Sequence, residues 1–110
     1  ADATIPNERG IAPGNGALVG AVERAVGHGP DVVVGKPNPD LYELASTRLE
    51  VAPDLVLAVC DRLDTDIAGA NAAGMPSVLV LTGVSTRDEA ESAAPELRPT
   101  YVVEDLRGLW

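Results

Sequence analysis

Several residue types are scarce in this 110-residue sequence, and each scarcity excludes a class of protein. Cys60 is the only cysteine, so no disulfide can form within the chain and we infer a cytoplasmic location. No apolar run approaches the roughly 20 residues that span a bilayer. No basic segment followed by an apolar stretch opens the chain, so we expect no signal peptide. Phenylalanine is absent, yet 45% of the residues are hydrophobic, which is typical of a folded α/β chain rather than a disordered one.

Positive charge is scarce as well. The chain has eight Lys and Arg residues and 17 Asp and Glu residues, which gives a net charge of −9. Such a field repels nucleic-acid backbones and anionic membranes, so we expect neither as a partner. It would also repel a phosphorylated ligand unless a cation or a local basic side chain reverses the sign at the site. The simpler alternative is an acidic surface without a specific role.

Apolar segments with strand character alternate with segments of helical periodicity along the chain. We expect residues 1–14 to be irregular. Strands are predicted at residues 32–34, 55–59, 77–81 and 101–103, and helices at residues 15–26, 39–49 and 64–73, with a short helix capped by Thr86 and Glu89. This order predicts a Rossmann-like α/β fold, with a parallel sheet of about four strands flanked by helices.

The predicted helices have recognisable ends and faces. Asn15 and Asn38 are suitable N-caps, Pro39 suits a first helical position, and Gly27 suits a left-handed end. We expect two apolar stripes to face inward: Leu18, Ala21, Val22, Ala25 and Val26 in the first helix, and Leu41, Leu44, Ala45 and Leu49 in the second.

Three carboxylates, Asp61, Asp64 and Asp66, follow the predicted strand at residues 55–59. Chemistry in parallel sheets lies at the carboxyl ends of the strands, and carboxylate oxygens there suit Mg²⁺. The alternative is an acidic helix start that complements the helix dipole. That alternative explains Asp64 well and Asp61 poorly, because Asp61 precedes the helix.

Lys36 follows the first predicted strand and precedes a helix, a position that suits an anion. On its own it could equally be an exposed lysine in a turn. It is not the lysine of a P-loop, since Pro30 and Pro37 occupy positions that need Gly and Ser or Thr. The glycines at positions 14, 16 and 20 leave a nucleotide-binding module as a further alternative, although no strand is predicted before them.

Lys36 and the acidic loop are far more specific together than either is alone. Residues 34–39 (VGKPNP) followed by residues 61–67 (DRLDTDI) resemble motifs III and IV of the haloacid-dehalogenase-like superfamily. Residues 13–16, 70–74 and 81–84 resemble its subfamily IIA, whose large α/β cap is inserted between motifs II and III. That branch includes phosphatases of p-nitrophenyl phosphate, phosphoglycolate, glycerol phosphate and nucleotides.

The resemblance implies a Mg²⁺-dependent hydrolase of phosphoric monoesters with a small phosphorylated metabolite as substrate. In such enzymes an aspartate attacks phosphorus and forms an aspartyl-phosphate. Lys36 would be catalytic, neutralising the nucleophile and the phosphoryl oxygens. Asp61 would ligate Mg²⁺, and Asp66 would hold the metal's water shell and Lys36. Asp64 falls where the family varies, so the resemblance implies no role for it.

The chain departs from the family pattern in two ways. It lacks the Asp-x-Asp-Gly-Thr strand of motif I and the Ser or Thr of motif II. We therefore expect residues 1–14 to be a connector from a cap, residues 15–110 to be the C-terminal half of a core, and this fragment to be inactive. Cys60 also replaces the usual glycine of motif IV, where a side chain could crowd the metal loop. The alternative is a non-catalytic module that forms a homo-oligomer through an exposed edge at residues 55–59.

Overall fold

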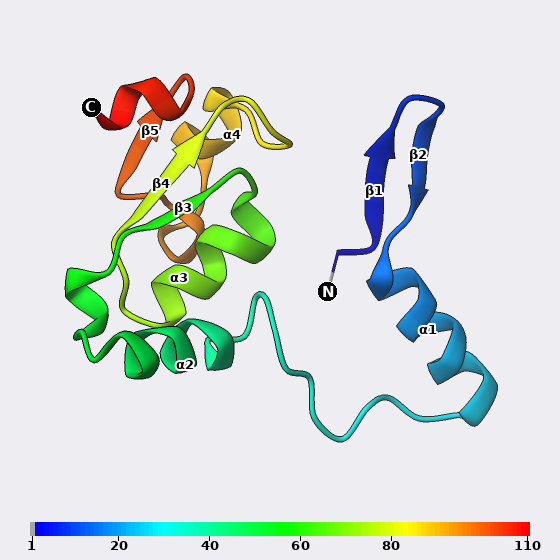
Figure 1. Cartoon of the computed structure of the whole chain (residues 1–110). Coiled ribbons are helices and arrows are strands. Elements are labelled where there is room, and N and C mark those ends of the chain that lie inside the picture. The colour runs from blue at the N-terminus through cyan, green and yellow to red at the C-terminus, as the bar shows by residue number, and fades with distance from the viewer. Residues whose placement is uncertain (1) are drawn as a thin grey trace. The chain divides into compact units, whose positions relative to one another are not determined.

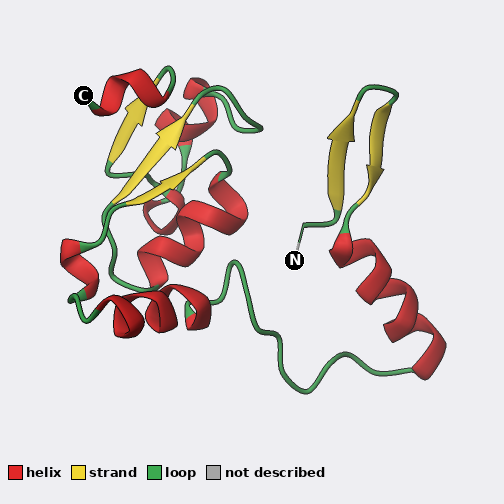
Figure 2. Cartoon of the chain, in the orientation of Figure 1, coloured by secondary structure: helices red, strands yellow, loops and turns green. Residues whose placement is uncertain are grey.

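The computed structural model describes residues 2–110, which fall into two compact units. The first ends at Val33 and the second runs from Val34 to Trp110. Figure 1 traces the chain through both units, and Figure 2 shows that each contains strands and at least one helix. Each unit is described by itself below.

The first unit begins with a β-hairpin. Strand β1 (Thr4–Asn7) pairs antiparallel with β2 (Gly10–Pro13), and Ile5 lies opposite Ala12. The prediction of an irregular segment at residues 1–14 is therefore wrong for residues 4–13. Proline is tolerated in strands that lie at a sheet edge, and both strands of a hairpin are edges. Gly10, with φ of +120°, adopts a backbone conformation at the turn that other residues rarely take.

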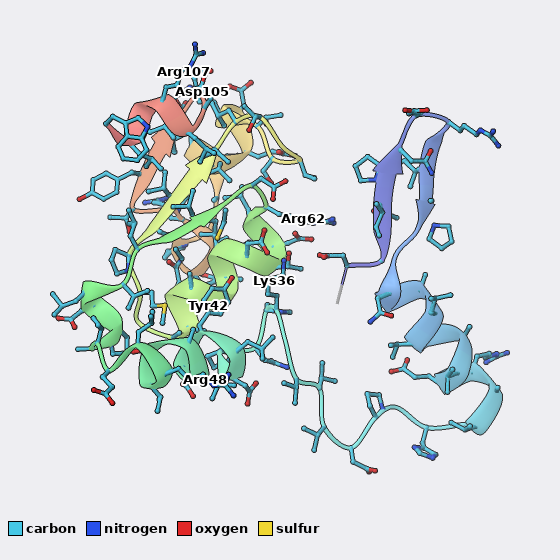
Figure 3. All side chains as sticks on the ribbon, viewed as in Figure 1. Lys36, Tyr42, Arg48, Arg62, Asp105 and Arg107 are labelled. Carbon is cyan, nitrogen blue, oxygen red and sulfur yellow. The ribbon has the colours of Figure 1, made fainter. Side chains whose placement is uncertain are left out.

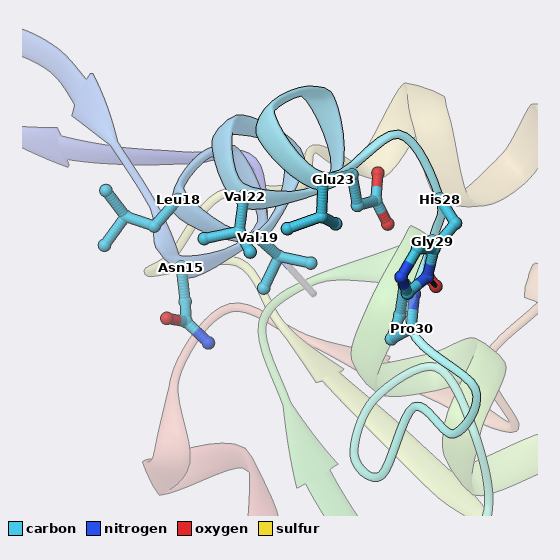
Figure 4. A pocket seen from close by; sticks show the side chains of 9 residues that line it. Asn15, Leu18, Val19, Val22, Glu23, His28, Gly29 and Pro30 are labelled. Atoms are coloured by element: carbon cyan, nitrogen blue, oxygen red, sulfur yellow. Dashed lines mark hydrogen bonds between the residues drawn. The ribbon is translucent and has the colours of Figure 1, made fainter.

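Helix α1 (Asn15–Val26) follows the hairpin and ends at Gly27, whose left-handed conformation confirms the predicted helix end. Gly14, and not Asn15, is the N-cap, and no side chain caps this end. The apolar stripe has the predicted periodicity, but none of its residues is buried. Three residues of the stripe, Leu18, Val22 and Val26, line a hollow within the first unit together with His28 and Pro30 (Figure 4).

The second unit is built on a parallel three-stranded sheet in the order β3-β4-β5 (Figure 1). Its strands are β3 (Ala58–Cys60), β4 (Ser77–Val80) and β5 (Tyr101–Val103). The α/β class and the parallel sheet are thus confirmed. The strand predicted at residues 32–34 does not form, because these residues pair with no strand among those described.

Four helical segments flank this sheet. They are α2 (Asp40–Leu49), a π-helical turn (Leu63–Ile67) that continues into α3 (Ala68–Ala72), and α4 (Arg87–Ser92). Helix α4 has the predicted capping box of Thr86 and Glu89. Helix α2 begins after Pro39, so Asn38 is not its N-cap. Short 3-10 turns occupy residues Pro53–Leu55, Pro95–Leu97 and Leu106–Leu109.

Helix α2 buries a different face from the one predicted. Leu41, Leu44 and Leu49 are exposed, whereas Ser46 is buried and Tyr42 is half-buried. Tyr42 and Ser46 lie four residues apart, so they share one side of the helix. Both hydroxyls donate to main-chain carbonyls elsewhere in the unit, Tyr42 to Asp66 and Ser46 to Val51. Hydrogen bonding, which apolar periodicity does not register, therefore determines which side of α2 faces the core.

The core consists of two apolar clusters that meet at Cys60. Strand β4 is buried along its whole length. One cluster joins β3 to α3, and the other joins β4 to the π-helical turn and α4. Their buried members are Ala58, Ala70, Ala73 and Met75 in the first, and Leu63, Ile67, Leu79 and Ala90 in the second. Among the described residues, no helix has the length and apolarity needed to cross a membrane.

Candidate active site

Lys36 and Asp66 meet although they are far apart in sequence. Lys36 lies in the loop before α2, and Asp66 lies in the π-helical turn that follows β3. The Lys36 ammonium forms an ion pair with Oδ1 of Asp66. The Asp66 side chain is 9% exposed and that of Lys36 is 43% exposed, so a nearly buried carboxylate faces a cation that solvent reaches. Figure 3 shows Lys36 beside the segment that carries Arg62.

Asp61 directly follows β3, where the sequence predicts it, and is held by the loop after β4. Its Oδ2 accepts a hydrogen bond from the main-chain N–H of Val84 at 3.1 Å. Its carbonyl accepts one from the N–H of Ser85 at 3.0 Å. A Cβ at Gly83 would lie 2.1 Å from Oδ2 of Asp61, so the close approach of this loop requires glycine. The carboxylate therefore has a defined position at the carboxyl end of the sheet.

The π-helical turn leaves Asp64 at the surface, paired with the half-buried Arg62. Asp64 is 63% exposed and pairs with Nε of Arg62 at 2.8 Å. The N–H of Leu63 donates to Oγ of Ser85 at 3.1 Å, which ties the turn to the loop after β4. Asp64 thus acts as a surface partner of Arg62, while Asp66 points inward. This separation agrees with the absence of an assigned role for Asp64.

Tyr42 is a residue of this region that the sequence analysis did not identify. Its hydroxyl donates to the main-chain carbonyl of Asp66 at 3.0 Å. Burial raises the pKa of Tyr42 far above its ordinary value, and the nearby Cys60 and Asp66 raise it further. Burial likewise raises the pKa of the Cys60 thiol, with Asp66 adding to the effect. A neutral thiol is a poor nucleophile, so Cys60 is not suited to attack a substrate.

The glycine pattern at residues 14–20 is explained by contacts within the hairpin unit. A strand does precede Gly14, contrary to the prediction, but it belongs to an antiparallel hairpin and not to a βαβ unit. The N–H groups of Gly14 and Gly16 donate at 2.9 Å to the carbonyls of Ala3 and Asp2. A Cβ at Gly14 would lie 2.3 Å from the Asp2 carbonyl oxygen. These amides are therefore occupied by the chain itself, which argues against a dinucleotide site.

The carboxylate oxygens of this site are the type of ligand that suits a magnesium ion. Mg²⁺ takes hard oxygen ligands and usually only one or two carboxylates. Asp61 and Asp66 supply two carboxylates from one short segment, one oriented by Val84 and the other facing Lys36. No group of three or more His, Cys, Asp or Glu side chains suited to a metal occurs within residues 2–110.

Known proteins resemble the chain in both sequence and structure. Residues 33–109 match the HAD-hydrolase-like family. D-Glycerol 3-phosphate phosphatase from Mycobacterium tuberculosis is 52% identical over 108 residues, which cover 98% of this chain and 30% of that protein. A crystal structure of a glycerol phosphate phosphatase from the same organism, in complex with magnesium, aligns over 98% of this chain and 32% of its own, with a TM-score of 0.89 and 52% identity.

A 4-nitrophenylphosphatase from Thermotoga maritima shows the same relationship at greater distance. It is 35% identical, covers 98% of this chain and 41% of its own, and has a TM-score of 0.87. The chain thus spans about a third of the length of the relatives it matches. The match over most of the chain, the parallel sheet and the Lys36–Asp66 pair all agree with the motifs identified in the sequence. The chain belongs to the haloacid-dehalogenase-like hydrolases, in the subfamily of glycerol-phosphate and p-nitrophenyl phosphatases.

Proposed function

We propose that this chain contributes the lysine and two of the acids of a Mg²⁺-dependent site that hydrolyses phosphoric monoesters. The observation that carries the proposal is the Lys36–Asp66 ion pair beside a held Asp61 carboxylate. Lys36 neutralises the charge of Asp66 at this edge, in a chain whose net charge is −9. A bound Mg²⁺ would add the positive charge that draws a dianionic substrate here against the overall field.

Each residue has a distinct part in the proposed reaction. The Lys36 ammonium donates hydrogen bonds to phosphoryl oxygens and offsets their growing negative charge, which is electrostatic stabilisation of the transition state. Asp66 holds Lys36 in place, and Asp61 and Asp66 hold Mg²⁺ directly or through water. When bound, Mg²⁺ acts as a Lewis acid and a template for the phosphoryl group. The Val84 N–H orients the Asp61 carboxylate.

Binding of Mg²⁺ to the chain tests the metal assignment. We expect a titration with MgCl2, followed by amide NMR, to shift signals around Asp61, Asp66 and Val84. Asp61→Asn and Asp66→Asn should each weaken these shifts, because they remove a hard anionic ligand. Asp64→Asn is the matched control, since Asp64 lies in the same loop but is exposed and paired with Arg62. Equal shifts in the Asp61, Asp66 and Asp64 variants would overturn the assignment.

We propose further that the 110 residues alone do not turn over substrate. They contain no Asp-x-Asp-Gly-Thr segment, which by family resemblance supplies the nucleophile and the general acid/base. The test is an assay of the pure chain with Mg²⁺ and p-nitrophenyl phosphate, using Lys36→Ala as background. Turnover above that background would show that the chain carries a nucleophile of its own.

The substrate proposed for the site is a small phosphorylated metabolite. The support comes from relatives: one matched protein is a D-glycerol 3-phosphate phosphatase and another is a 4-nitrophenylphosphatase. The substrates in both names are phosphoric monoesters of a small alcohol or a phenol.

A cytoplasmic location, inferred from the single cysteine, stays a prediction.

A second candidate function is a non-catalytic, self-associating module. It is favoured by one observation: β3 pairs only with β4, so its other edge has no strand partner among residues 2–110, and Val59 is 42% exposed. An open edge invites strand pairing with another copy. Sedimentation should then show a dimer whose fraction rises with concentration. A monomer throughout the accessible concentration range would eliminate this candidate.

A further inference from the structure

Tyr42 joins the two segments that carry the charged pair. It lies in the first turn of α2, directly after the loop that holds Lys36. Its hydroxyl donates to the main-chain carbonyl of Asp66 at 3.0 Å. The bond therefore links α2 to the π-helical turn through the backbone of Asp66. It is a second connection beside the Lys36–Asp66 ion pair, and it does not depend on charge.

The ring of Tyr42 is fixed by a close approach to α3. A Cβ at Gly69 would lie 2.7 Å from Cε2 of Tyr42 and 3.3 Å from the carbonyl oxygen of Pro37. Glycine at this position lets both the ring and the Lys36 loop lie directly on the helix. Tyr42 also packs against the buried cluster of Ala58, Ala70, Ala73 and Met75. The hydroxyl is therefore aimed by packing and does not sample other partners freely.

Cys60 completes the arrangement from β3. Cys60 and Tyr42 both pack against the buried cluster of Ala58, Ala70, Ala73 and Met75. The Cys60 side chain stands where the family resemblance expects glycine, so it adds a packing contact to that cluster.

We propose that Tyr42 is a positioning residue of the site: aimed by its packing against Gly69 and the buried cluster, it holds the Asp66 backbone so that the Asp66 carboxylate stays against Lys36. The proposal deepens the proposed function, because the phosphatase reaction is what the pair would serve. The geometry itself needs neither metal nor substrate. Tyr42 is not assigned a contact with either.

The sequence offers a direct readout, since Lys36 is the only lysine in the chain. Lysine labelled with ¹³C at Cε gives a single side-chain NMR signal, and peptide mapping separates Lys36 acylation from that of the N-terminal amine. The Asp66→Asn variant serves as the reference, because it gives the signal and the acylation rate of Lys36 when the Asp66 carboxylate is absent. We expect Tyr42→Phe to move the ¹³C signal and the acylation rate of Lys36 toward their values in Asp66→Asn. Acylation should become about fivefold faster, because the loss of one hydrogen bond changes a population by about that factor. Tyr101→Phe is the matched control, since Tyr101 is 59% exposed.

Cys60→Ala provides a packing control near Tyr42. It leaves the Tyr42 hydroxyl and its Asp66 acceptor in place, so the Lys36 signal should stay near that of the native chain. The thermal unfolding midpoint of each variant reports folding independently of the Lys36 signal.

Two outcomes would overturn the positioning role. One is a Tyr42→Phe protein whose Lys36 signal and acylation rate match the native chain, even if its unfolding midpoint falls, because Tyr42 would then serve stability alone. The other is a native Lys36 signal that already equals that of Asp66→Asn, because there would be no pair to position. If the Lys36 signal moves as expected but no Mg²⁺ binds, the positioning role stands and the proposed function fails.

Discussion

The Lys36 ammonium and the Asp66 carboxylate form an ion pair that joins the loop before α2 to the π-helical turn after β3. Asp66 is nearly buried, and a buried carboxylate without a compensating charge is costly. Lys36 therefore stabilises the loop that carries Asp66 as well as presenting a cation to solvent. The same contact that would serve phosphoryl transfer also holds the two motifs together.

Replacing Gly69 with alanine should destabilise the second unit. The new Cβ would lie 2.7 Å from the Tyr42 ring and 3.3 Å from a main-chain oxygen, and the backbone atom cannot swing aside. Overpacking of this kind costs about 1–3 kcal/mol. Urea unfolding measures the change. Gly20→Ala is the matched control in a helix: its Cβ meets nothing within 4 Å, so the free energy of unfolding should stay constant or rise. Equal stability of the two variants would show that the Gly69 contact is not tight.

Replacing Gly83 with alanine should displace Asp61. The added Cβ would lie 2.1 Å from Oδ2 and 2.3 Å from Cβ of Asp61, so rotating the carboxylate alone does not relieve the clash. The hydrogen bond from Val84 N–H would break, and we expect the Mg²⁺-induced shift of the Val84 amide to be lost. Amide NMR with and without MgCl2 measures this. A native Mg²⁺ response in Gly83→Ala would contradict the position assigned to Asp61.

The capping box of α4 should make stability depend on acid pH. Hydrogen bonds from the backbone N–H and the side chain of Thr86 lower the pKa of Glu89 below its ordinary value of 4.5. A lowered folded-state pKa means that the carboxylate stabilises the fold above about pH 4.5 and that this contribution is lost as the pH falls through the folded value. Glu89→Gln should therefore lower the unfolding midpoint at pH 7 more than at pH 3. Glu91→Gln, outside the box, should show no such difference, and parallel pH profiles for the two would contradict the assignment.

Cys60 should react slowly with alkylating reagents. Burial and the nearby Asp66 raise its pKa, so little thiolate exists at neutral pH. Since Cys60 is the only cysteine, the mass shift with iodoacetamide reports this one thiol. We expect alkylation at pH 7.5 to be many-fold slower in the folded chain than in urea, and to accelerate as the pH rises above 9. A folded-state rate equal to that of the unfolded chain would show that burial does not protect the thiol.

Local signals in the sequence predicted much of this fold. The segment from Asp40 to Leu49 reads as a helix, and Thr86 with Glu89 reads as a capping box, because both depend on neighbouring residues. Lys36 and Asp66 are identifiable because their motifs are short and contiguous. Their contact does not follow from strand order, since the strand expected before Lys36 does not form and Lys36 reaches Asp66 from the loop before α2.

Other features depend on contacts that periodicity does not report. The three valines at positions 32–34 look like a strand, but a strand needs a neighbour to pair with, and none of those described provides one. The prolines in β1 and β2 favoured an irregular segment in the sequence, although a strand at a sheet edge tolerates proline. The face of α2 follows the hydroxyls of Tyr42 and Ser46, whose acceptors lie elsewhere in the chain. Tyr42 has no sequence signal for its role, because its acceptor is a main-chain carbonyl 24 residues away.

The central claim is that Lys36, Asp61 and Asp66 form a working part of a phosphatase site. The most direct test is to replace the matching segment of the Mycobacterium tuberculosis D-glycerol 3-phosphate phosphatase with this chain and to measure Mg²⁺-dependent hydrolysis of glycerol 3-phosphate. We expect the chimera to be active, and Lys36→Ala or Asp61→Asn within it to lower kcat about 10²–10³-fold, as when a transition-state donor is removed. Arg48→Ala, on the exposed side of α2, should leave kcat unchanged. A folded chimera without activity, or one whose Lys36→Ala variant keeps full activity, would contradict the account.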